Sequence, residues 1–543
     1  MSPKDDLQKI IQGEVLDDHE TLSAYSHDAS IFEIKPKVVV FPKNANDITQ
    51  LVRFINQHPK DNLSITVHSA GTDMTGGAIN DSIILDIKKY LNSLIKVSEQ
   101  STIVQPGMLY RDFEAETLKQ NLLLPTYPAS REICTIGGMV ATNAGGELEL
   151  TYGPINKYLK KLKVVLADGY EYTFQAINQN ELNKKITQQS FEGKIYSEIY
   201  ELIKENEELI KKAKPQTSKN STGYDLWEVW DGKTFDLSKL IIGSQGTLGI
   251  ITEAEFSLIK PQPHQVLLVI SLTDLSQLDQ IVKTVLEFGP EAFECYDDQT
   301  LKLAQSHAWD ISANFKHSNR ISAFLNLFLE KLLKNPPSLT LLANFTSGSK
   351  KEALQQAQMA KNALSLFNLK VKIKETSASQ EKYWLIRHKS FGLLMKYSGT
   401  DKKASSFIDD IIVKPEYLPQ FLPKLNQLIE PYKDKMVYTL AGHIGDGNFH
   451  IIPLMDLSKE DVREIIPELM EKVFKLVFEY KGSMSAEHND GLIRGAYLPL
   501  MYGNEVYQLF KKVKEIFDPN NIFNPHKKVD ATFGYSFNHL AKN

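Results

Sequence analysis

The chain has 543 residues, 42% hydrophobic and 24% charged, which is typical of globular proteins large enough for two to four domains. Its net charge of -5 lacks the basic excess that marks nucleic-acid-binding proteins, so no nucleic-acid partner is expected. Cys134 and Cys295 are too few for a thiolate zinc site, an iron–sulfur cluster or a disulfide framework. The start, MSPKDDLQKI, lacks the apolar core of a signal peptide, and no apolar run is long enough to span a membrane. We therefore expect a cytoplasmic protein.

Residues 1–35 predict short helices ahead of a first domain over residues 36–262. In that domain a helical stretch, NDITQLVRFINQ, alternates with short runs rich in β-formers, a pattern typical of an α+β fold with many strands. The predicted strands are KVVVF, SITVH, SIILDI, STIVQPG, KLKVVLADG, KLIIG and GIITEAEFSLI. The stiff sequence Lys260-Pro261-Gln262-Pro263 predicts the end of the domain.

Residues 263–460 predict a second α+β domain, with strands at QVLLVISL and SLTLLANF and a helix at DLSQLDQIVKTVLEF. Residues 461–543 read mainly as amphipathic helices, EDVREIIPELMEKVFKLVFEY and NEVYQLFKKVKEIF. One further helix, from Ile321 to Leu333, has an apolar stripe between basic flanks. That stripe fits a helix packed on a sheet, or a helix lying on a membrane surface.

Three glycine-rich segments fall in the first domain: HSAGTDMTGGA (68–78), TIGGMVATNAGG (135–146) and GSQGTLGIITEA (243–254). Glycine lets backbone N–H groups approach an anion closely, and several such loops can enclose a pyrophosphate. Neither GxGxxG opening a helix nor GxxxxGK[ST] is present, and a predicted strand follows GSQGTLG. One such loop alone is more commonly a structural turn. Three in one domain favour a large, phosphate-bearing cofactor.

The segment AGHIGDGNFH (441–450) carries two histidines around a tight turn. The flanks VYTL and IIPL are rich in β-formers, and Asp446-Gly447 predicts a two-residue hairpin turn. In that register His443 faces His450, with Cβ atoms about 4.5–5.5 Å apart. Such a pair suits two ligands of one metal ion. The hairpin alone leaves ordinary strand histidines equally open.

The chain also carries a series of longer motifs that together resemble one family. In order these are PKVVVFPKNANDITQLV, HSAGTDMTGG, VQPGMLYRDFE, LPTYPASREICTIGGMVATNAGG, GSQGTLGIITEAEF, GHIGDGNFH, SAEHNDGLIR and FDPNNIFNP. They resemble the FAD-linked oxidoreductases that include D-lactate dehydrogenase of the cytochrome type, the glycolate oxidase FAD subunit and D-2-hydroxyglutarate dehydrogenase. The resemblance implies a PCMH-type FAD domain at 36–262, a substrate-side cap domain with a metal site at 263–460, and a C-terminal helical segment, 461–543, that returns to the FAD domain.

The resemblance further implies which residues bind FAD. The pyrophosphate loop would be Ser69, Ala70, Gly71, Thr72, Asp73, Met74 and Thr75. The rest of the cofactor would lie along Pro128, Ser130, Gly137, Gly138, Thr142, Asn143, Gly145, Gly146, Gly243, Gly249, Ile250 and Asn524. Gln245 departs from the usual GSEGTLG, and His68 stands where an arginine is common. His68 is also not where related proteins link flavin to histidine, so non-covalent FAD is expected.

SAEHNDG places Glu487 beside His488, and neighbours on an extended strand face opposite sides, so one could face a metal and the other a substrate. His443, His450 and Glu487 form a set suited to Zn²⁺ or Mn²⁺. In the resembling enzymes these positions bind a divalent metal beside the flavin. A metal lowers the pKa of a substrate hydroxyl, and a neutral imidazole accepts its proton. His488 is the predicted base, or alternatively a hydrogen bonder that orients Glu487.

Arg387, in EKYWLIRHKS, matches the tryptophan-x-x-arginine motif of the family and predicts a clamp for the substrate carboxylate. The alternative is an ordinary solvated helix arginine. Ile452 follows His450 by two positions, where the hydroxyglutarate type tends to carry asparagine, so D-lactate is the favoured substrate.

The predicted function is thus an FAD- and metal-dependent dehydrogenase that oxidises a D-2-hydroxy acid by hydride transfer to flavin. A quinone or a cytochrome would accept the electrons. The stripe at 321–333 would allow peripheral contact with the inner face of a membrane. The alternatives are a non-redox FAD transferase of the alkyl-dihydroxyacetone-phosphate synthase type, which would lack the His/His/Glu set, and a flavin subunit of a larger oxidase complex.

Overall fold

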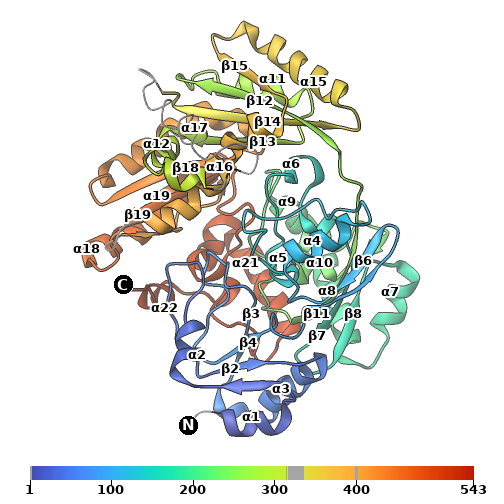
Figure 1. The fold of residues 1–543 in the computed structure, drawn as a ribbon. Helices are drawn as coiled ribbons and strands as arrows, with labels where there is room; N and C mark the ends of the chain where they lie inside the picture. The colour runs from blue at the N-terminus through green and yellow to red at the C-terminus, as the bar shows by residue number, and fades with distance from the viewer. Residues whose placement is uncertain (1–2, 314, 316–335, 398–401, 543) are drawn as a thin grey trace.

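Two bodies make up the protein in the computed structural model, which describes residues 3–313, 315, 336–397 and 402–542 (Figure 1). The lower body in the view of Figure 1 carries a four-stranded and a five-stranded sheet, and the upper body carries an eight-stranded sheet. The helix predicted at 321–333 lies outside the described residues. Within the described ranges, no helix has both the length and the apolarity to cross a membrane.

The four-stranded sheet has the order β1 (Glu14–Leu16), β2 (Val38–Phe41), β4 (Ile83–Asp86), β3 (Ile65–His68). The two pairings among β2, β4 and β3 are parallel, and β1 adds an antiparallel edge. Parallel strands bury both faces, which explains why VVVF and IILD are buried at every position. Helices α1 (Lys4–Ile10), α2 (His19–Ala24) and α3 (Ala45–Gln57) accompany this sheet. Residues 1–35, predicted as helical, therefore also supply a strand.

The five-stranded sheet is antiparallel, in the order β5 (Leu94–Val97), β6 (Ser101–Val104), β11 (Ile250–Ser257), β7 (Leu159–Val165), β8 (Glu171–Phe174). β11 alternates buried and half-buried residues, as a strand with one covered face should. Helices α4 (Tyr110–Leu118), α5 (Ile136–Thr142) and α8 (Phe191–Glu205) share its core. Most of the predicted strand KLIIG instead belongs to helix α10 (Ser238–Ile241), because an apolar run of three residues suits a buried helical turn equally well.

The eight-stranded sheet has the order β15 (Lys370–Lys374), β12 (His264–Leu272), β14 (Leu339–Ser347), β13 (Ala292–Asp297), β18 (Met436–His443), β19 (Asn448–Met455), β16 (Lys403–Ala404), and β17 (Ile411–Ile412) also pairs with β19. Val266, Leu268 and Ile270 face a core shared with α11 (Leu278–Leu286), α15 (Lys350–Ala363), α17 (Leu418–Ile429) and α19 (Ile465–Glu479). Leu267 and Val269 face α12 (Asp298–Ser306) and α16 (Ser377–Tyr397). We call residues 264–479 the cap.

The C-terminal part of the chain returns to the lower body, as predicted, but only after residue 480. Helices α18 (Glu460–Arg463) and α19, which the sequence analysis assigns to the returning segment, lie with the cap, and α19 shares its core. Helix α21 (Leu498–Phe517) places Val506, Phe510 and Val513 in the core of the five-stranded sheet (Figure 1). The segment that returns to the lower body therefore begins after α19, the helix that completes the cap.

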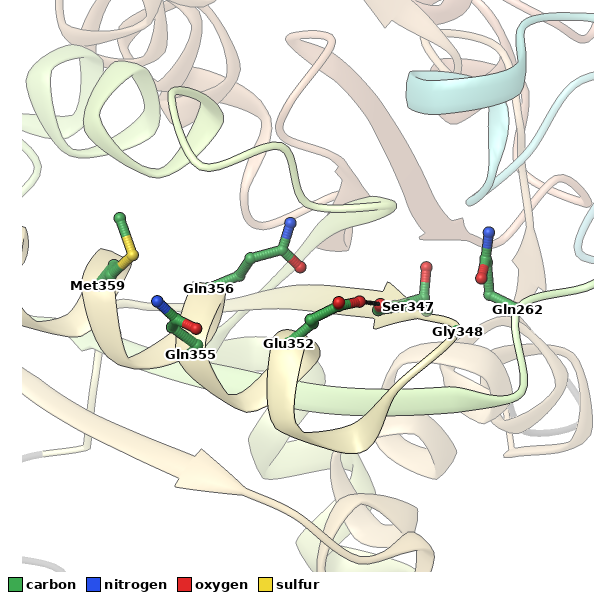
Figure 2. A pocket seen from close by; sticks show the side chains of 8 residues that line it. Gln262, Ser347, Gly348, Glu352, Gln355, Gln356 and Met359 are labelled. Carbon is green, nitrogen blue, oxygen red and sulfur yellow. Dashed lines mark hydrogen bonds between the residues drawn. The ribbon is translucent and has the colours of Figure 1, made fainter.

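A polar hollow of about 360 Å³ lies beside α15 near the crossing between the two bodies (Figure 2). Gln355, Gln356 and Met359 border it on the helix, and Gln262 on the connecting segment. Glu352 is its one charged lining residue and accepts a hydrogen bond of 2.5 Å from the Ser347 hydroxyl. None of the predicted site residues borders this hollow.

Candidate active site

A second cavity, of about 580 Å³, lies between the lower body and the cap. This volume is in the usual range for small-molecule sites, roughly 300–1,000 Å³. The lower body lines it with loops from the three glycine-rich segments and with residues 128–135. The opposite wall carries Arg387, His388, Asp409, Thr439, Ala441, His450, Ile452, Glu487 and His488. The predicted cofactor loops thus meet Arg387, His450, Glu487 and His488 in one cavity, whereas the predicted ligand His443 does not line it.

Most of the predicted cofactor residues line this cavity: Ser69, Ala70, Gly71, Thr72, Asp73, Met74, Pro128, Ser130, Gly137, Gly138, Thr142, Gly145 and Gly249. The predicted residues that do not line it are Thr75, Asn143, Gly146, Gly243, Ile250 and Asn524. These six residues are not part of the cavity surface. The buried Asn524 amide, for example, donates to Gly77 O (2.8 Å) and Gln245 O (2.7 Å), which ties the returning tail to the loops. Direct contact of the individual residues with FAD stays a prediction.

The lining fits a flat, phosphate-bearing cofactor because side chains are missing where it would lie. A Cβ atom added at Gly138 would lie 3.3 Å from Thr135 Oγ1 and 3.5 Å from Ser69 Oγ, both on cavity-lining residues. At Gly146 a Cβ would lie 2.0 Å from the backbone oxygen of Tyr127, so the loop itself needs glycine there. Gly146 does not line the cavity itself, so the glycine there serves the shape of the loop behind it.

Gln245, the departure from the usual glutamate, has a physical reason in this chain. Its Nε2 donates to Asp73 Oδ2 (3.1 Å), and its Oε1 accepts from the backbone N–H of Gly491 (2.8 Å). Asp73 also accepts from the N–H groups of Thr75 (2.7 Å) and Gly77 (3.0 Å), so its carboxylate organises the loop. A glutamate at 245 would place two carboxylates against each other.

The predicted register of the histidine hairpin is wrong by two residues. His443 pairs with Asn448, and His450 pairs with Ala441, so the turn contains four residues, Ile444–Gly447. Successive bonds from Asp446 N to His443 O (3.0 Å) and from Gly447 N to Ile444 O (3.1 Å) form this wider turn. A shift of two keeps both histidines on one face, as diagonal neighbours. Their ring centroids are 5.2 Å apart.

Three imidazoles converge on a single oxygen, Oε1 of Glu487. The Nε2 atoms of His443, His450 and His488 lie 3.2, 3.3 and 3.9 Å from it. Nitrogen and oxygen ligands bound to one tetrahedral ion at about 2.1 Å are separated by roughly 3.4 Å. The first two distances therefore match ligands of one ion, and His488 stands slightly outside the set.

Glu487 and His488 do not lie on an extended strand, so the expectation that they face opposite sides is wrong. Both backbone N–H groups donate to Oδ2 of Asp410, at 2.9 and 2.8 Å, and the chain bends around this carboxylate. Both side chains therefore reach the cavity wall. Asp410, His450, Glu487 and His488 each bring one donor atom within 4.8 Å of the others.

Asp410 is nevertheless a poor candidate for a metal ligand. Besides the two N–H groups, its Oδ2 accepts from the Ser485 hydroxyl (2.6 Å), and its Oδ1 accepts from the Asn448 amide (3.1 Å). An ion would have to displace these donors. His443 offers its Nε2 atom instead, which lies 3.2 Å from Oε1 of Glu487. The donors of the described residues that lie within 4.8 Å of one another do not include His443, so the predicted set of His443, His450 and Glu487 stays a prediction.

A carboxylate lies against the outer nitrogen of every one of the three imidazoles. His443 Nδ1 is 2.6 Å from Glu294 Oε1, His450 Nδ1 is 3.3 Å from Asp409 Oδ1, and His488 Nδ1 is 2.9 Å from Asp409 Oδ2. The two contacts to Asp409 are close charge contacts and are not aligned as hydrogen bonds. A proton held on Nδ1 leaves the Nε2 lone pair free for an ion or a proton, the usual arrangement behind metal-bound histidine.

Burial and charge oppose each other throughout this cluster. Burial raises the pKa of Glu487, but Lys219 and His443 outweigh it and hold that pKa well below its ordinary value. Burial lowers the pKa of His450, but Asp409 and Glu487 outweigh it and raise that pKa to about 10. Without an ion, therefore, protons neutralise the site. A divalent cation would take their place.

A buried lysine to which the sequence assigns no role, Lys219, lies behind the cluster. Lys219 Nζ is 3.2 Å from Glu149 Oε2, 3.6 Å from Glu487 Oε2 and 3.7 Å from Asp446 Oδ2. It joins the lower body, the hairpin turn and the loop of Glu487. Asp409 and Glu294 were also missed, although the Asp409-Asp410 doublet beside β17 was a local signal.

Arg387, on α16, is buried at the cavity wall. Its Nε and one terminal nitrogen lie 2.9 and 2.8 Å from Oε2 of Glu294. The solvated alternative is therefore excluded by its burial. Its role as a carboxylate clamp stays a prediction.

Comparison with known proteins agrees with this architecture. Residues 261–528 match the family "FAD linked oxidases, C-terminal domain", and residues 36–175 match "FAD binding domain". The chain belongs to the FAD-linked oxidases. The family resemblance, the PCMH-type fold and the FAD-binding domain predicted from the sequence are thereby confirmed.

Among its relatives, D-2-hydroxyglutarate dehydrogenase of Pseudomonas putida is 25% identical over 95% of this chain and 50% of its own length, so the chain spans about half of that protein. D-lactate dehydrogenase of Archaeoglobus fulgidus is 26% identical over 97% of this chain and 99% of its own. The structures of p-cresol methylhydroxylase with substrate bound (TM-score 0.68, 14% identity, 97% and 96% covered) and of alkyldihydroxyacetonephosphate synthase (0.65, 15%, 94% and 83%) share the fold.

We expect Gly138→Val to abolish FAD uptake, because its side chain would crowd the hydroxyls of Ser69 and Thr135, which line the cavity. Reconstitution followed by absorbance near the flavin bands measures this. Gly348→Val, at a glycine with no atom within 4 Å of an added Cβ, is the control and should bind FAD normally. Normal FAD binding by Gly138→Val would contradict this placement of the cofactor.

Lys219→Met should strip three buried carboxylates of their shared cation and lower stability by about 3–5 kcal/mol, the usual cost of an uncompensated buried charge. Thermal unfolding of the purified protein measures this as a fall in Tm. Lys212→Met, at an exposed position of α9 (Glu207–Ala213), is the control and should leave Tm unchanged. Equal Tm values for the two variants would show that Lys219 is not needed for neutralisation.

Proposed function

We propose that this protein is an FAD- and divalent-metal-dependent dehydrogenase that oxidises a D-2-hydroxy acid, D-lactate above all, to the 2-oxo acid. The observation that carries the proposal is that His443 and His450 both lie against Glu487, and that His450 and Glu487 line the same cavity as the glycine-rich loops. Relatives over the whole chain carry the names D-lactate dehydrogenase and D-2-hydroxyglutarate dehydrogenase.

The proposal assigns the lower wall of the cavity to non-covalent FAD and the histidine cluster to Zn²⁺ or Mn²⁺. FAD supplies an acceptor for the substrate hydride, and the ion supplies a Lewis acid for the substrate hydroxyl. His443, His450 and Glu487 would hold the ion, with the Nδ1 atoms of both histidines turned toward carboxylates. Loops 69–74, 128–138 and 245–249 would hold the flavin nucleotide.

His488 is the proposed base. Its Nδ1 lies 2.9 Å from Asp409, so a proton kept there leaves Nε2 to accept the proton of the substrate hydroxyl. Asp409 would then stabilise the imidazolium that forms, as a buried carboxylate does behind a catalytic histidine. The longer distance from His488 Nε2 to Glu487 Oε1, 3.9 Å, keeps this nitrogen outside the ligand set and toward the cavity.

Arg387 is the proposed clamp for the substrate carboxylate. Glu294 holds its guanidinium through Nε and one terminal nitrogen. Arg387 also lines the cavity, and the planar fork of a guanidinium suits two-point binding of a carboxylate.

The wall beside His450 supports a small apolar substituent on the acid. Ile452 lies two residues after His450 on β19, so both project to the same face, and both line the cavity. Thr439 and Ala441 complete this wall from β18. These side chains suit the methyl group of lactate better than the second carboxylate of hydroxyglutarate.

A non-redox transferase is the alternative from a different class, and it rests on the shared fold with alkyldihydroxyacetonephosphate synthase. A cluster of three imidazoles and a carboxylate has no evident use in such a reaction. A flavin subunit of a larger complex is a further alternative, because some relatives are about twice as long as this chain. In the favoured proposal a quinone or cytochrome accepts the electrons from a cytoplasmic protein, with peripheral contact at the inner face of a membrane.

We expect His443→Ala, His450→Ala and Glu487→Gln each to lose metal and anaerobic flavin reduction by D-lactate while retaining FAD, because none of the three residues belongs to the glycine-rich loops. Chelation should give the same loss in the unaltered protein, and Zn²⁺ or Mn²⁺ should restore it. His488→Ala should keep both metal and FAD and slow flavin reduction by roughly 10²–10⁴-fold, the usual share of a general base. Metal analysis, together with single-turnover measurements of flavin absorbance, distinguishes the metal ligands from the general base. Full metal occupancy in the first three variants would refute the site.

Ile452→Asn should shift the preference between acids, because an amide would replace the apolar wall beside His450. We expect kcat/KM for D-lactate to fall and that for D-2-hydroxyglutarate to rise. One lost apolar contact changes such ratios by about 10–200-fold. Ile451→Val, at a buried position that does not line the cavity, is the control. If the unaltered protein already prefers D-2-hydroxyglutarate, the assignment of lactate fails while the reaction class stands.

A further inference from the structure

Glu294 contacts both functional parts of the site at once. It lies on β13, the strand next to β18, and is buried to 1% exposure. Its Oε1 is 2.6 Å from Nδ1 of His443, and its Oε2 is 2.9 Å from Nε and 2.8 Å from a terminal nitrogen of Arg387. One carboxylate therefore connects a proposed metal ligand with the proposed substrate clamp.

We propose that Glu294 is a positioning residue that fixes His443 for the metal and Arg387 for the substrate carboxylate together. This inference rests on the proposed function, because it takes the roles of His443 and Arg387 from there. The positions of His443 and Arg387 are therefore not independent of each other. A hydroxy acid needs its hydroxyl at one group and its carboxylate at the other, and Glu294 sets the spacing between them.

The hydrogen positions follow from the chemistry of the three side chains. Arginine only donates, and an ionised carboxylate only accepts. Nδ1 of His443 must therefore carry a proton toward Glu294 Oε1. With that tautomer fixed, the lone pair of Nε2 points toward Glu487 Oε1, 3.2 Å away, where the ion would lie. Glutamate is thus required as a double acceptor.

The same pairing sets the strength of the clamp. Glu294 neutralises part of the guanidinium charge of Arg387 in a buried place, where opposite charges interact strongly. An incoming carboxylate then meets an arginine that is held in place but whose charge is partly balanced. Removing the charge of Glu294 should consequently loosen the metal and strengthen the attraction of Arg387 for a carboxylate.

Glutamine at 294 makes this contrast measurable, because it has the same shape but can accept on one side only. Its oxygen should turn to Arg387, since hydrogen bonds to a charged group are the stronger ones. Its amide N–H₂ would then face Nδ1 of His443. Nδ1 would have to accept, the proton would move to Nε2, and Nε2 would no longer be a ligand.

The experiment compares Glu294→Gln with the unaltered FAD-loaded protein after chelation. Titration with Zn²⁺ reads the metal site, and titration of the metal-free protein with propionate, which has a carboxylate but no hydroxyl, reads the clamp through the flavin absorbance. We expect Zn²⁺ affinity to fall by about 10–100-fold, the usual effect of losing a carboxylate behind a metal-bound histidine. Propionate affinity should stay equal or rise. Glu291→Gln, whose carboxylate accepts from Tyr152 (2.9 Å), is the matched control and should change neither.

A fall in Zn²⁺ affinity without a fall in propionate affinity would support the inference, because general damage to the fold would weaken the binding of both ligands. Unchanged Zn²⁺ affinity in Glu294→Gln would overturn it, as would a parallel loss of Zn²⁺ and propionate binding. A wild-type protein that binds no Zn²⁺ would instead contradict the proposed metal site, and with it the inference. If the wild-type protein binds Zn²⁺, a loss of Zn²⁺ affinity in Glu294→Gln is attributable to the change at Glu294.

Discussion

The site depends on one buried contact, in which Oε1 of Glu487 faces the Nε2 atoms of His443 and His450 at 3.2 and 3.3 Å. Three pieces of backbone must meet for this to happen. The hairpin of β18 and β19 brings the histidines to one face, and the loop around Asp410 presents Glu487. The returning tail then fixes the cofactor loops through Asn524. Most of the long-range architecture thus serves to hold two nitrogens and one oxygen in place.

Charge balance explains why this contact calls for a cation. Carboxylates surround the cluster at Glu149, Glu294, Asp409, Asp446 and Glu487, whereas the permanent cations among them are Lys219 and Arg387. Buried charge without compensation is expensive, so protons on imidazole or a metal ion must supply the rest. The raised pKa of His450, about 10, reflects that demand, since Asp409 and Glu487 outweigh its burial. Metal binding and proton release should therefore be coupled.

The sequence predicted the elements well where local pattern determines them. Continuous apolar runs such as VVVF and QVLLVISL became strands covered on both faces, and the alternating IITEAEFS became a strand with one covered face. KLIIG was ambiguous for a physical reason, because three apolar residues fit a helical turn and a strand alike. The roles of individual site residues came from the family resemblance rather than from pattern.

What the sequence could not predict were contacts between distant segments. The hairpin turn widened to four residues, and its Gly445 N–H bonds to Phe293 O on β13, a partner that the local sequence cannot show. Glu487 and His488 share one wall because Asp410 bends their backbone. Glu294 and Lys219 are single charged residues whose partners are distant in the sequence. Glu294 meets Arg387 and His443 within the cap, and Lys219 meets Glu149 in its own body and Asp446 in the cap.

Anomalous diffraction from crystals of the FAD-loaded protein grown with Zn²⁺ tests the central claim most directly. Data collected above and below the zinc absorption edge locate the ion without reference to activity. The account predicts one strong peak within bonding distance of His443 Nε2, His450 Nε2 and Glu487 Oε1, roughly 2.0–2.2 Å from each. A peak bound to Asp410 instead, or no peak there when zinc occupies other sites in the same crystal, would contradict it.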